Sequence, residues 1–149
     1  MHITVTDLDI ASARAMGNIK APGYRIHFTC SLVTGSAVFV PGCAASDELK
    51  GQTFWVEVGQ ESIEEFVSVP PTAPHEPRLT ALPRDGDFEV VGMITSIVRV
   101  GDPATMDILT ITVADASFTV ESNDLGTGYR EGEWVTFIAR DVSLWDEAI

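Results

Sequence analysis

The 149-residue sequence has few basic residues and no apolar run long enough to cross a bilayer as a helix. Nine Lys and Arg oppose 22 Asp and Glu, which gives a formal net charge of −13. Because nucleic acid is a polyanion whose binding usually needs several cations, this balance argues against general nucleic-acid binding. Residues 1–7 lack the basic and apolar regions of a secretory signal. We therefore expect a soluble, cytoplasmic protein with no membrane partner.

Motifs for catalysis and for metal binding are also lacking. The three histidines, His2, His27 and His75, are spaced so that no two are expected in one coordination sphere. No nucleophile elbow and no phosphate-binding loop occurs. Asp7-Leu8-Asp9 and Asp85-Gly86-Asp87 lack the ligand series of a calcium loop, and the second of them is typical of a turn. We predict no enzyme activity, no metal site and no cofactor.

Cys30 and Cys43 are the only cysteines. In the strand register predicted below they lie diagonally on one face of a hairpin, at a spacing that would allow a disulfide. Without a secretory signal, we expect instead two reduced thiols that are buried as small hydrophobic side chains.

The acidic residues that are present are unevenly distributed. Residues 1–69 contain eight acids and four bases, a net charge of −4, whereas residues 85–149 contain thirteen acids and three bases, a net charge of −10. Residues 70–84 carry a net charge of +1, and no lysine follows them. This distribution favours a basic partner, although acidic surfaces also keep proteins soluble.

Two stretches of the chain share apolar periodicity when one is shifted by 79 positions. These are Cys30–Phe66 and Leu109–Trp145, and the shift aligns Phe39 with Phe118, Trp55 with Trp134, Val56 with Val135 and Phe66 with Trp145. Five of the eight prolines fall between Val69 and Asp85, where they favour an extended segment. We predict one unit over residues 1–69, a linker or strap over 70–84, and a second, strongly acidic unit over 85–149.

The first unit is predicted to be mostly strand. Tyr24–Thr34 and Ala37–Pro41 should form a hairpin around Gly35-Ser36, because a glycine in the first position suits a type II′ turn. Ser46–Gly51 is typical of one helical turn, whereas Asp9–Gly17 fits either a short helix or an extended strand. The hairpin would place one apolar set on a common face: Phe28, Cys30, Leu32, Phe39, Pro41 and Cys43. Further strands are expected over Gln52–Val58 and Ile63–Val69.

In the second unit, apolar and polar residues alternate more regularly than in the first. A long strand over Phe88–Val100 should precede a hairpin of Asp107–Val113 with Ala116–Ser122. Pairing of Val113 with Ala116 would bury one face of this hairpin, which holds Leu109, Ile111, Val113, Ala116, Phe118 and Val120. Trp134–Ala139 and Val142–Trp145 should supply the last strands.

The apolar stretch Val90–Ile94, followed later by Glu131–Phe137, is similar to the first and fourth strands of an OB-fold, a small five-stranded Greek-key barrel. The resemblance implies an all-β chain of two OB-like barrels in tandem, with little helix. A single β-sandwich of about ten strands is the structural alternative. A resemblance of fold does not by itself assign a function.

Two acidic clusters are candidate sites for a basic protein partner, such as an enzyme that this chain would inhibit or to which it would give immunity. They comprise Glu57, Glu61, Glu64 and Glu65 in the first unit, and Asp141, Trp145, Asp146 and Glu147 at the carboxyl end. One alternative is a module for single-stranded nucleic acid, with Arg99, Tyr129, Arg130 and Arg140 along one groove. Another is a structural subunit of a larger assembly.

Overall fold

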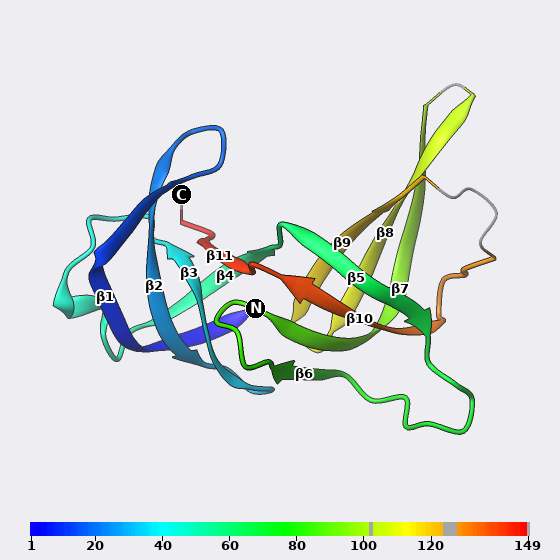
Figure 1. Cartoon of the computed structure of the whole chain (residues 1–149), viewed down its shortest axis with the longest axis horizontal. Helices are drawn as coiled ribbons and strands as arrows, with labels where there is room; N and C mark the ends of the chain where they lie inside the picture. Colours follow the sequence, from blue (N-terminus) through cyan, green and yellow to red (C-terminus); the bar gives the residue numbers. More distant parts are fainter. Residues whose placement is uncertain (102, 124–127, 149) are drawn as a thin grey trace.

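The computed structural model describes residues 1–101, 103–123 and 128–148, and these residues form two β-sheets (Figure 1). The one helical segment among them is a 3₁₀ turn, Asp47–Leu49, within the segment where one helical turn was predicted. No helix in the described ranges has the length and apolarity needed to cross a membrane. The strands are β1 (His2–Met16), β2 (Ala21–Thr29), β3 (Thr34–Val40), β4 (Thr53–Gly59), β5 (Ser62–Ser68), β6 (Arg78–Ala81), β7 (Phe88–Gly101), β8 (Ala104–Val113), β9 (Ala116–Ser122), β10 (Trp134–Arg140) and β11 (Ser143–Asp146).

The first sheet is a closed barrel with the strand order β1-β2-β3-β11-β4. Strand β4 closes it by pairing with β1, so that His2 lies opposite Trp55. Strand β11, from the carboxyl end of the chain, runs parallel to β3 and antiparallel to β4. The spatial order β4-β1-β2-β3 is that of a Greek key.

The second sheet has the order β5-β10-β7-β8-β9, and β6 pairs with β7 outside this path. Its strands β10-β7-β8-β9 repeat the Greek-key order of the barrel. Strand β5 pairs antiparallel with β10, over Ser62 to Ser68. The proline-rich segment between the predicted units contributes β6 to this sheet and is therefore more than a linker.

The two sheets exchange strands across the boundaries predicted from the sequence. Strand β5 lies within residues 1–69 but pairs in the second sheet, and β11 lies within residues 85–149 but completes the barrel (Figure 1). The ranges of the sheets therefore differ from the predicted units. The physical reason is that alternation along a strand specifies which side chains are buried, but it does not specify which strand lies alongside.

A single cluster of buried apolar side chains spans both sheets. Phe28 of β2 and Phe88 of β7 connect the two sheets, with ring centroids 6.1 Å apart. Within the second sheet, Phe118 packs edge-on against Phe137 at 5.7 Å. The two sheets consequently share one core, and Figure 1 shows them side by side along the long axis of the molecule.

The second predicted hairpin is confirmed. In the first, the two predicted strands pair, but the predicted position of the turn is wrong. Val113 lies opposite Ala116, and the predicted apolar face is buried. In the first hairpin the turn lies at residues 30–33, where the Cys30 amide donates to the Val33 carbonyl at 2.9 Å. Gly35 lies within β3, opposite Phe28. A Cβ atom at Gly35 would lie 2.9 Å from the ring of Phe88, so close packing explains this glycine.

Two further expectations are settled by the fold. The segment Asp9–Gly17 continues the extended strand β1 up to Met16, so its helical alternative is wrong. Both cysteines are free thiols. Cys30 is partly buried and Cys43 is exposed, which corrects the expectation that both would be buried.

Candidate functional site

The edges of the second sheet define the first candidate site. Strand β5 pairs only with β10, and β9 pairs only with β8, so among the described residues each of these two strands has one backbone edge without a strand partner. Two adjoining hollows, of about 450 and 170 Å³, lie between these edges. We call them together the edge groove, which is lined by Gln60, Glu61, Ser62, Ile63, Phe66, Leu109, Thr119, Val120, Glu121, Ser122 and Tyr129.

One side chain spans the edge groove. Gln60, in the connection between β4 and β5, donates from its Nε2 to the Thr119 carbonyl at 2.6 Å. The Oε1 atom of the same amide is buried and has no hydrogen-bond partner among the described residues. The connection between β4 and β5 therefore contacts β9 through a side chain, and one polar atom of that side chain is unsatisfied within the described part of the chain.

The part of the edge groove near Tyr129 has an apolar floor. The ring of Phe66 meets the ring of Tyr129 edge-on, with centroids 5.1 Å apart, and the Tyr129 hydroxyl donates to the Phe66 carbonyl at 3.4 Å. Burial raises the pKa of Tyr129, and the nearby Glu133 carboxylate raises it further. Tyr129, a candidate residue of the nucleic-acid alternative, is thus partly buried and packed.

Within the described ranges, the charged side chains that line the edge groove are two carboxylates. Glu61 and Glu121 are both exposed and line the same hollow, and within the described ranges neither forms an ion pair. Beyond Tyr129 an adjacent hollow of about 410 Å³ continues past Arg99, Asp107 and Glu131. Among the described residues, Arg99 is the one cation that lines these hollows, and it already faces Asp107, with Nε 3.5 Å from Oδ1. The groove and its continuation therefore carry a net negative charge.

Two of the predicted acidic residues are neutralised within the chain. Glu64 accepts two hydrogen bonds from Arg140, at 3.0 and 2.8 Å, and Arg140 also donates to Asp87 at 2.6 Å. The hydrogen bonds to Glu64 and then to Asp87 raise the pKa of Arg140 above its ordinary value. Asp141 accepts from Arg84 on both carboxylate oxygens, each at 3.0 Å. These acids form ion pairs at the junction between the sheets, so they are less available to bind a partner.

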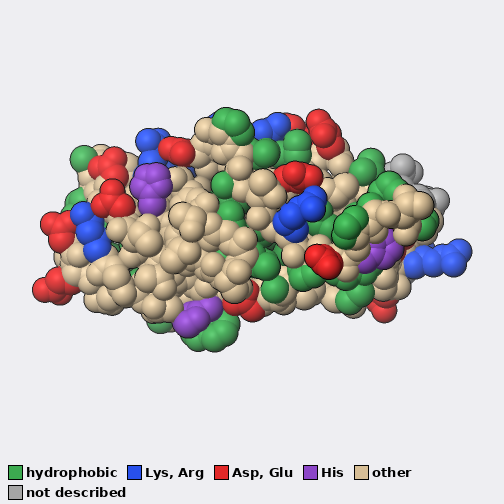
Figure 2. Space-filling view, turned by 90° about the horizontal axis from the view of Figure 1, so that it is seen from below, with side chains coloured by type: hydrophobic (Ala, Val, Ile, Leu, Met, Phe, Trp, Pro, Cys, Tyr) green, Lys and Arg blue, Asp and Glu red, His purple; other side chains and the backbone are tan. Residues whose placement is uncertain are grey.

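The remaining predicted acids are spread over other surfaces. Glu65 is exposed at an irregularity of β5, where its φ of 55° lies in the left-handed region. Glu57 lies on β4 opposite Trp145 of β11. Figure 2 shows that on one face the acidic side chains are dispersed and alternate with basic ones. The structure thus brings Glu61 to the edge groove and does not gather both predicted clusters there.

The carboxyl end of the described chain folds back onto the barrel. The Trp145 ring is partly buried, and its Nε1 donates to Ser143 Oγ at 3.0 Å. Asp146 accepts from the Gly42 amide at 3.1 Å, and the Glu147 amide donates to the Trp55 carbonyl at 3.0 Å. These contacts leave little of the segment projecting as a free acidic tail.

The four residues of the nucleic-acid alternative are separated by their contacts. Arg99 and Tyr129 line one hollow, but Arg99 faces Asp107 and Arg140 belongs to the ion pairs with Glu64 and Asp87. Arg130 is exposed, and its backbone amide donates to the Glu133 carboxylate at 3.1 Å.

The sequence did not indicate Gln60 or Glu121 as site residues. The two come together because β5 crosses into the second sheet, and no local pattern signals that crossing. Over the described ranges, no group of three or more His, Cys, Asp or Glu is arranged to hold a metal ion. Comparison with protein-family models, with curated proteins and with solved structures gave no match.

Proposed function

We propose that this protein is a non-enzymatic binding module that takes an extended, basic segment of a partner protein into the edge groove. The observation that carries the proposal is the pair of strand edges, on β5 and β9, that flank hollows rimmed by unpaired carboxylates. An inhibitor or immunity protein directed at a cationic enzyme would be one case of such a module.

Strand addition is the mode of recognition that these edges suit. An extended peptide that pairs with a free edge gains backbone hydrogen bonds whatever its sequence, and its alternate side chains enter pockets that give specificity. The floor near Phe66 and Tyr129 would take apolar side chains, and Glu61 and Glu121 would take Lys or Arg. The net charge of −13 would also speed the approach of a cationic partner.

A finer assignment of the fold accompanies this proposal. Five strands in Greek-key order, closed into a barrel with a short helical turn between β3 and β4, support an OB-type barrel. The second sheet supports the same assignment, with β5 in the place that β11 takes in the barrel. The offset of 79 positions aligns β5 with residues 141–147, which contain β11. We propose a tandem pair of OB-type units that have exchanged their last strands.

The test is a titration of the full chain, followed by fluorescence anisotropy, with peptides in which Lys alternates with Val. We expect binding that weakens as salt increases, because surface charge is screened. A peptide of the same charge with Pro at alternate positions should bind at least about tenfold more weakly, because Pro cannot donate to a strand ladder.

Matched variants locate the site. The double variant Glu61→Gln/Glu121→Gln should reduce the affinity about tenfold, whereas Glu48→Gln/Glu76→Gln removes two exposed acids elsewhere and should change it little. Equal affinity for the two peptides, or equal effects of the two double variants, would contradict the proposal. Binding of a single-stranded oligonucleotide in preference to the Lys-Val peptide would favour the nucleic-acid alternative instead.

A further inference from the structure

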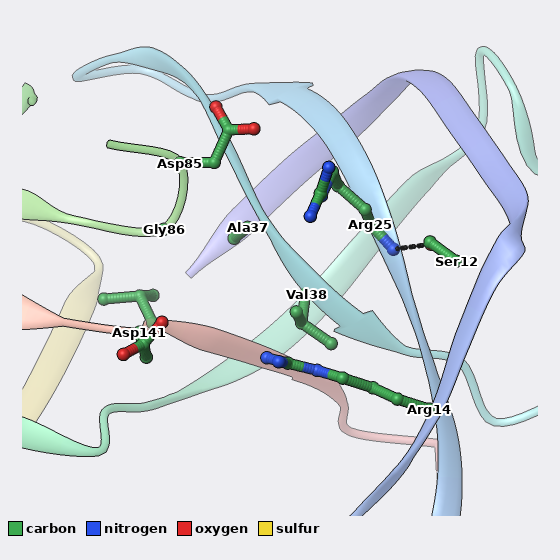
Figure 3. Close-up of a pocket in the computed structure, with 9 residues that line it drawn as sticks. Ser12, Arg14, Arg25, Ala37, Val38, Asp85, Gly86 and Asp141 are labelled. Carbon is green, nitrogen blue, oxygen red and sulfur yellow. Dashed lines mark hydrogen bonds between the residues drawn. The ribbon is translucent and has the colours of Figure 1, made fainter. Parts of the chain in front are cut away.

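A second cavity lies where the barrel meets the second sheet, separate from the edge groove (Figure 3). Its volume is about 100 Å³ and it is open to solvent. The barrel supplies Arg14 and Arg25, and the facing wall supplies Asp85, Gly86 and Asp141. Basic and acidic side chains therefore stand on opposite walls of one small cavity.

A bulge in β1 brings the two arginines together. Asp9 lies opposite Arg25 and Arg14 lies opposite Gly23, so four residues of β1, 10–13, face a single residue of β2. Ser12 fixes the bulge, because its Oγ accepts from the Arg25 amide at 2.7 Å and donates to the Asp9 carbonyl at 2.6 Å. Figure 3 shows both arginine side chains reaching toward the cavity.

These arginines differ from most basic residues of this chain in that they lack an ion pair among the described residues. Five of its nine basic residues, Lys50, Arg78, Arg84, Arg99 and Arg140, form ion pairs with acids. Within the described part of the chain, Arg14 and Arg25 form none, although acids exceed bases by thirteen. Two unpaired guanidinium groups at one cavity of an acidic protein are a ready site for an oxyanion.

The acidic wall is held in place by its backbone. The Gly86 amide donates to the Ser36 carbonyl at 3.0 Å, and the Val142 amide donates to the Gly86 carbonyl at 2.8 Å. Gly86 has a φ of +84° and Asp141 has a φ of 48°, so these two residues of the wall adopt left-handed backbone. Asp141 is paired with Arg84, whereas Asp85 has no ion pair among the described residues. Asp85 thus offers a free carboxylate opposite the arginines.

We propose that this cavity binds a small zwitterion of the amino-acid type, with its carboxylate on Arg14 and Arg25 and its ammonium group on Asp85. A guanidinium fork matches a carboxylate in geometry, and a carboxylate is the natural partner of an ammonium group. A zwitterion has no net charge and is not repelled by a chain of charge −13, whereas a simple anion is. The ligand would also tie the barrel to the second sheet.

The test is an NMR titration of the full chain with glycine, β-alanine and γ-aminobutyrate, in which the distance between the two charges increases. Acetate and ethylamine serve as probes that carry only one of the charges. We expect saturable shifts of the amide signals of Ser12, Gly86 and Val142 with at least one amino acid. Acetate and ethylamine should bind at least about tenfold more weakly, because each lacks one charged contact.

Variants separate the two walls. Arg25→Gln and Asp85→Asn should each weaken binding of the best amino acid about tenfold or more, whereas Lys20→Gln, at the exposed turn between β1 and β2, should leave it unchanged. Arg14→Gln is a second probe of the basic wall if Arg25→Gln unfolds at a lower temperature. No saturable shift with any amino acid, or equal binding of acetate, would overturn the proposal. Loss of peptide binding at the edge groove would leave it intact, because the two sites share no residue.

Discussion

The substitution Asp87→Asn tests the ion pair that lies deepest at the junction of the sheets. The Asp87 side chain is 0% exposed, and it accepts hydrogen bonds from Arg140 Nη1 at 2.6 Å and from the Asp141 amide at 3.1 Å. Burial by itself would raise the pKa of Asp87. The hydrogen bonds from Arg140 and the Asp141 amide, together with the charge of Arg84, outweigh burial and lower the pKa below its ordinary value.

Asparagine keeps the shape of the side chain and one acceptor for the Asp141 amide, but it removes the negative charge that faces Arg140. Removing one partner of a buried ion pair typically costs about 3–5 kcal/mol. Arg140 keeps its contact with Glu64 and is 27% exposed, so we expect the lower end, about 3 kcal/mol. At about 2–4 °C per kcal/mol for a chain of this size, Tm should fall by roughly 6–12 °C.

The matched control is Glu64→Gln. Glu64 pairs with the same Arg140, but its side chain is 50% exposed, so its loss should cost less than about 1 kcal/mol. Urea unfolding followed by tryptophan fluorescence gives both free energies of unfolding. An effect of Asp87→Asn no larger than that of Glu64→Gln would refute the reasoning.

The pH dependence gives an independent check on Asp87. Its folded-state pKa lies below the unfolded value of about 3.9, so the unfolded state binds more protons between these two values. The stabilisation by Asp87 is therefore fully present above about pH 5 and is lost as the pH falls through the folded-state pKa. We expect the difference in free energy of unfolding between the native chain and Asp87→Asn to shrink below about pH 4. A difference that stays constant from pH 7 to pH 3 would contradict the assignment.

Three further predictions concern packing and exposure. Gly35→Ala would place a Cβ atom 2.9 Å from the buried Phe88 ring, and thermal unfolding should show a loss of about 1–3 kcal/mol. Gly92→Ala would place a Cβ atom 2.8 Å from a backbone carbonyl of β8, which yields less easily than a side chain, so its loss should exceed that of Gly35→Ala in the same assay. Exposed Cys43 should react with a maleimide faster than partly buried Cys30 when both reactions are followed by mass spectrometry, and equal rates would contradict the fold at residues 30–43.

The two hairpins show which part of the fold a single sequence can predict. Strict alternation on both sides of a two-residue connection specified the pairing of Val113 with Ala116, and the structure has that register. In the first hairpin, Gly35 resembled a turn glycine, but its lack of a side chain serves contact with Phe88, a residue 53 positions away. Local patterns cannot distinguish a glycine needed for a turn from one needed for a distant contact, because both occur within apolar runs.

The candidate sites were less predictable than the strands for a related reason. Glu61 was expected from local acidity alone, whereas its neighbours in the edge groove, Gln60 and Glu121, belong to segments about sixty residues apart. Arg14 and Arg25 also required knowledge of the bulge in β1, which depends on the hydrogen bonds of Ser12. Long-range strand pairing and side-chain hydrogen bonds bring the residues of both sites together. The periodicity of the sequence predicts neither kind of contact.

The exchange of strands explains why both candidate sites lie next to the two crossings, which are the segments 60–61 and 141–142 where the chain passes from one sheet to the other. The two crossings run side by side, since the Glu61 amide donates to the Arg140 carbonyl at 3.0 Å and Gly59 lies opposite Ser143. The first crossing carries Gln60 and Glu61 into the edge groove, and the second carries Asp141 into the cavity between the sheets. Each site therefore combines residues from both halves of the chain. Neither half by itself could form either site, because each lacks a strand or a wall that the other half supplies.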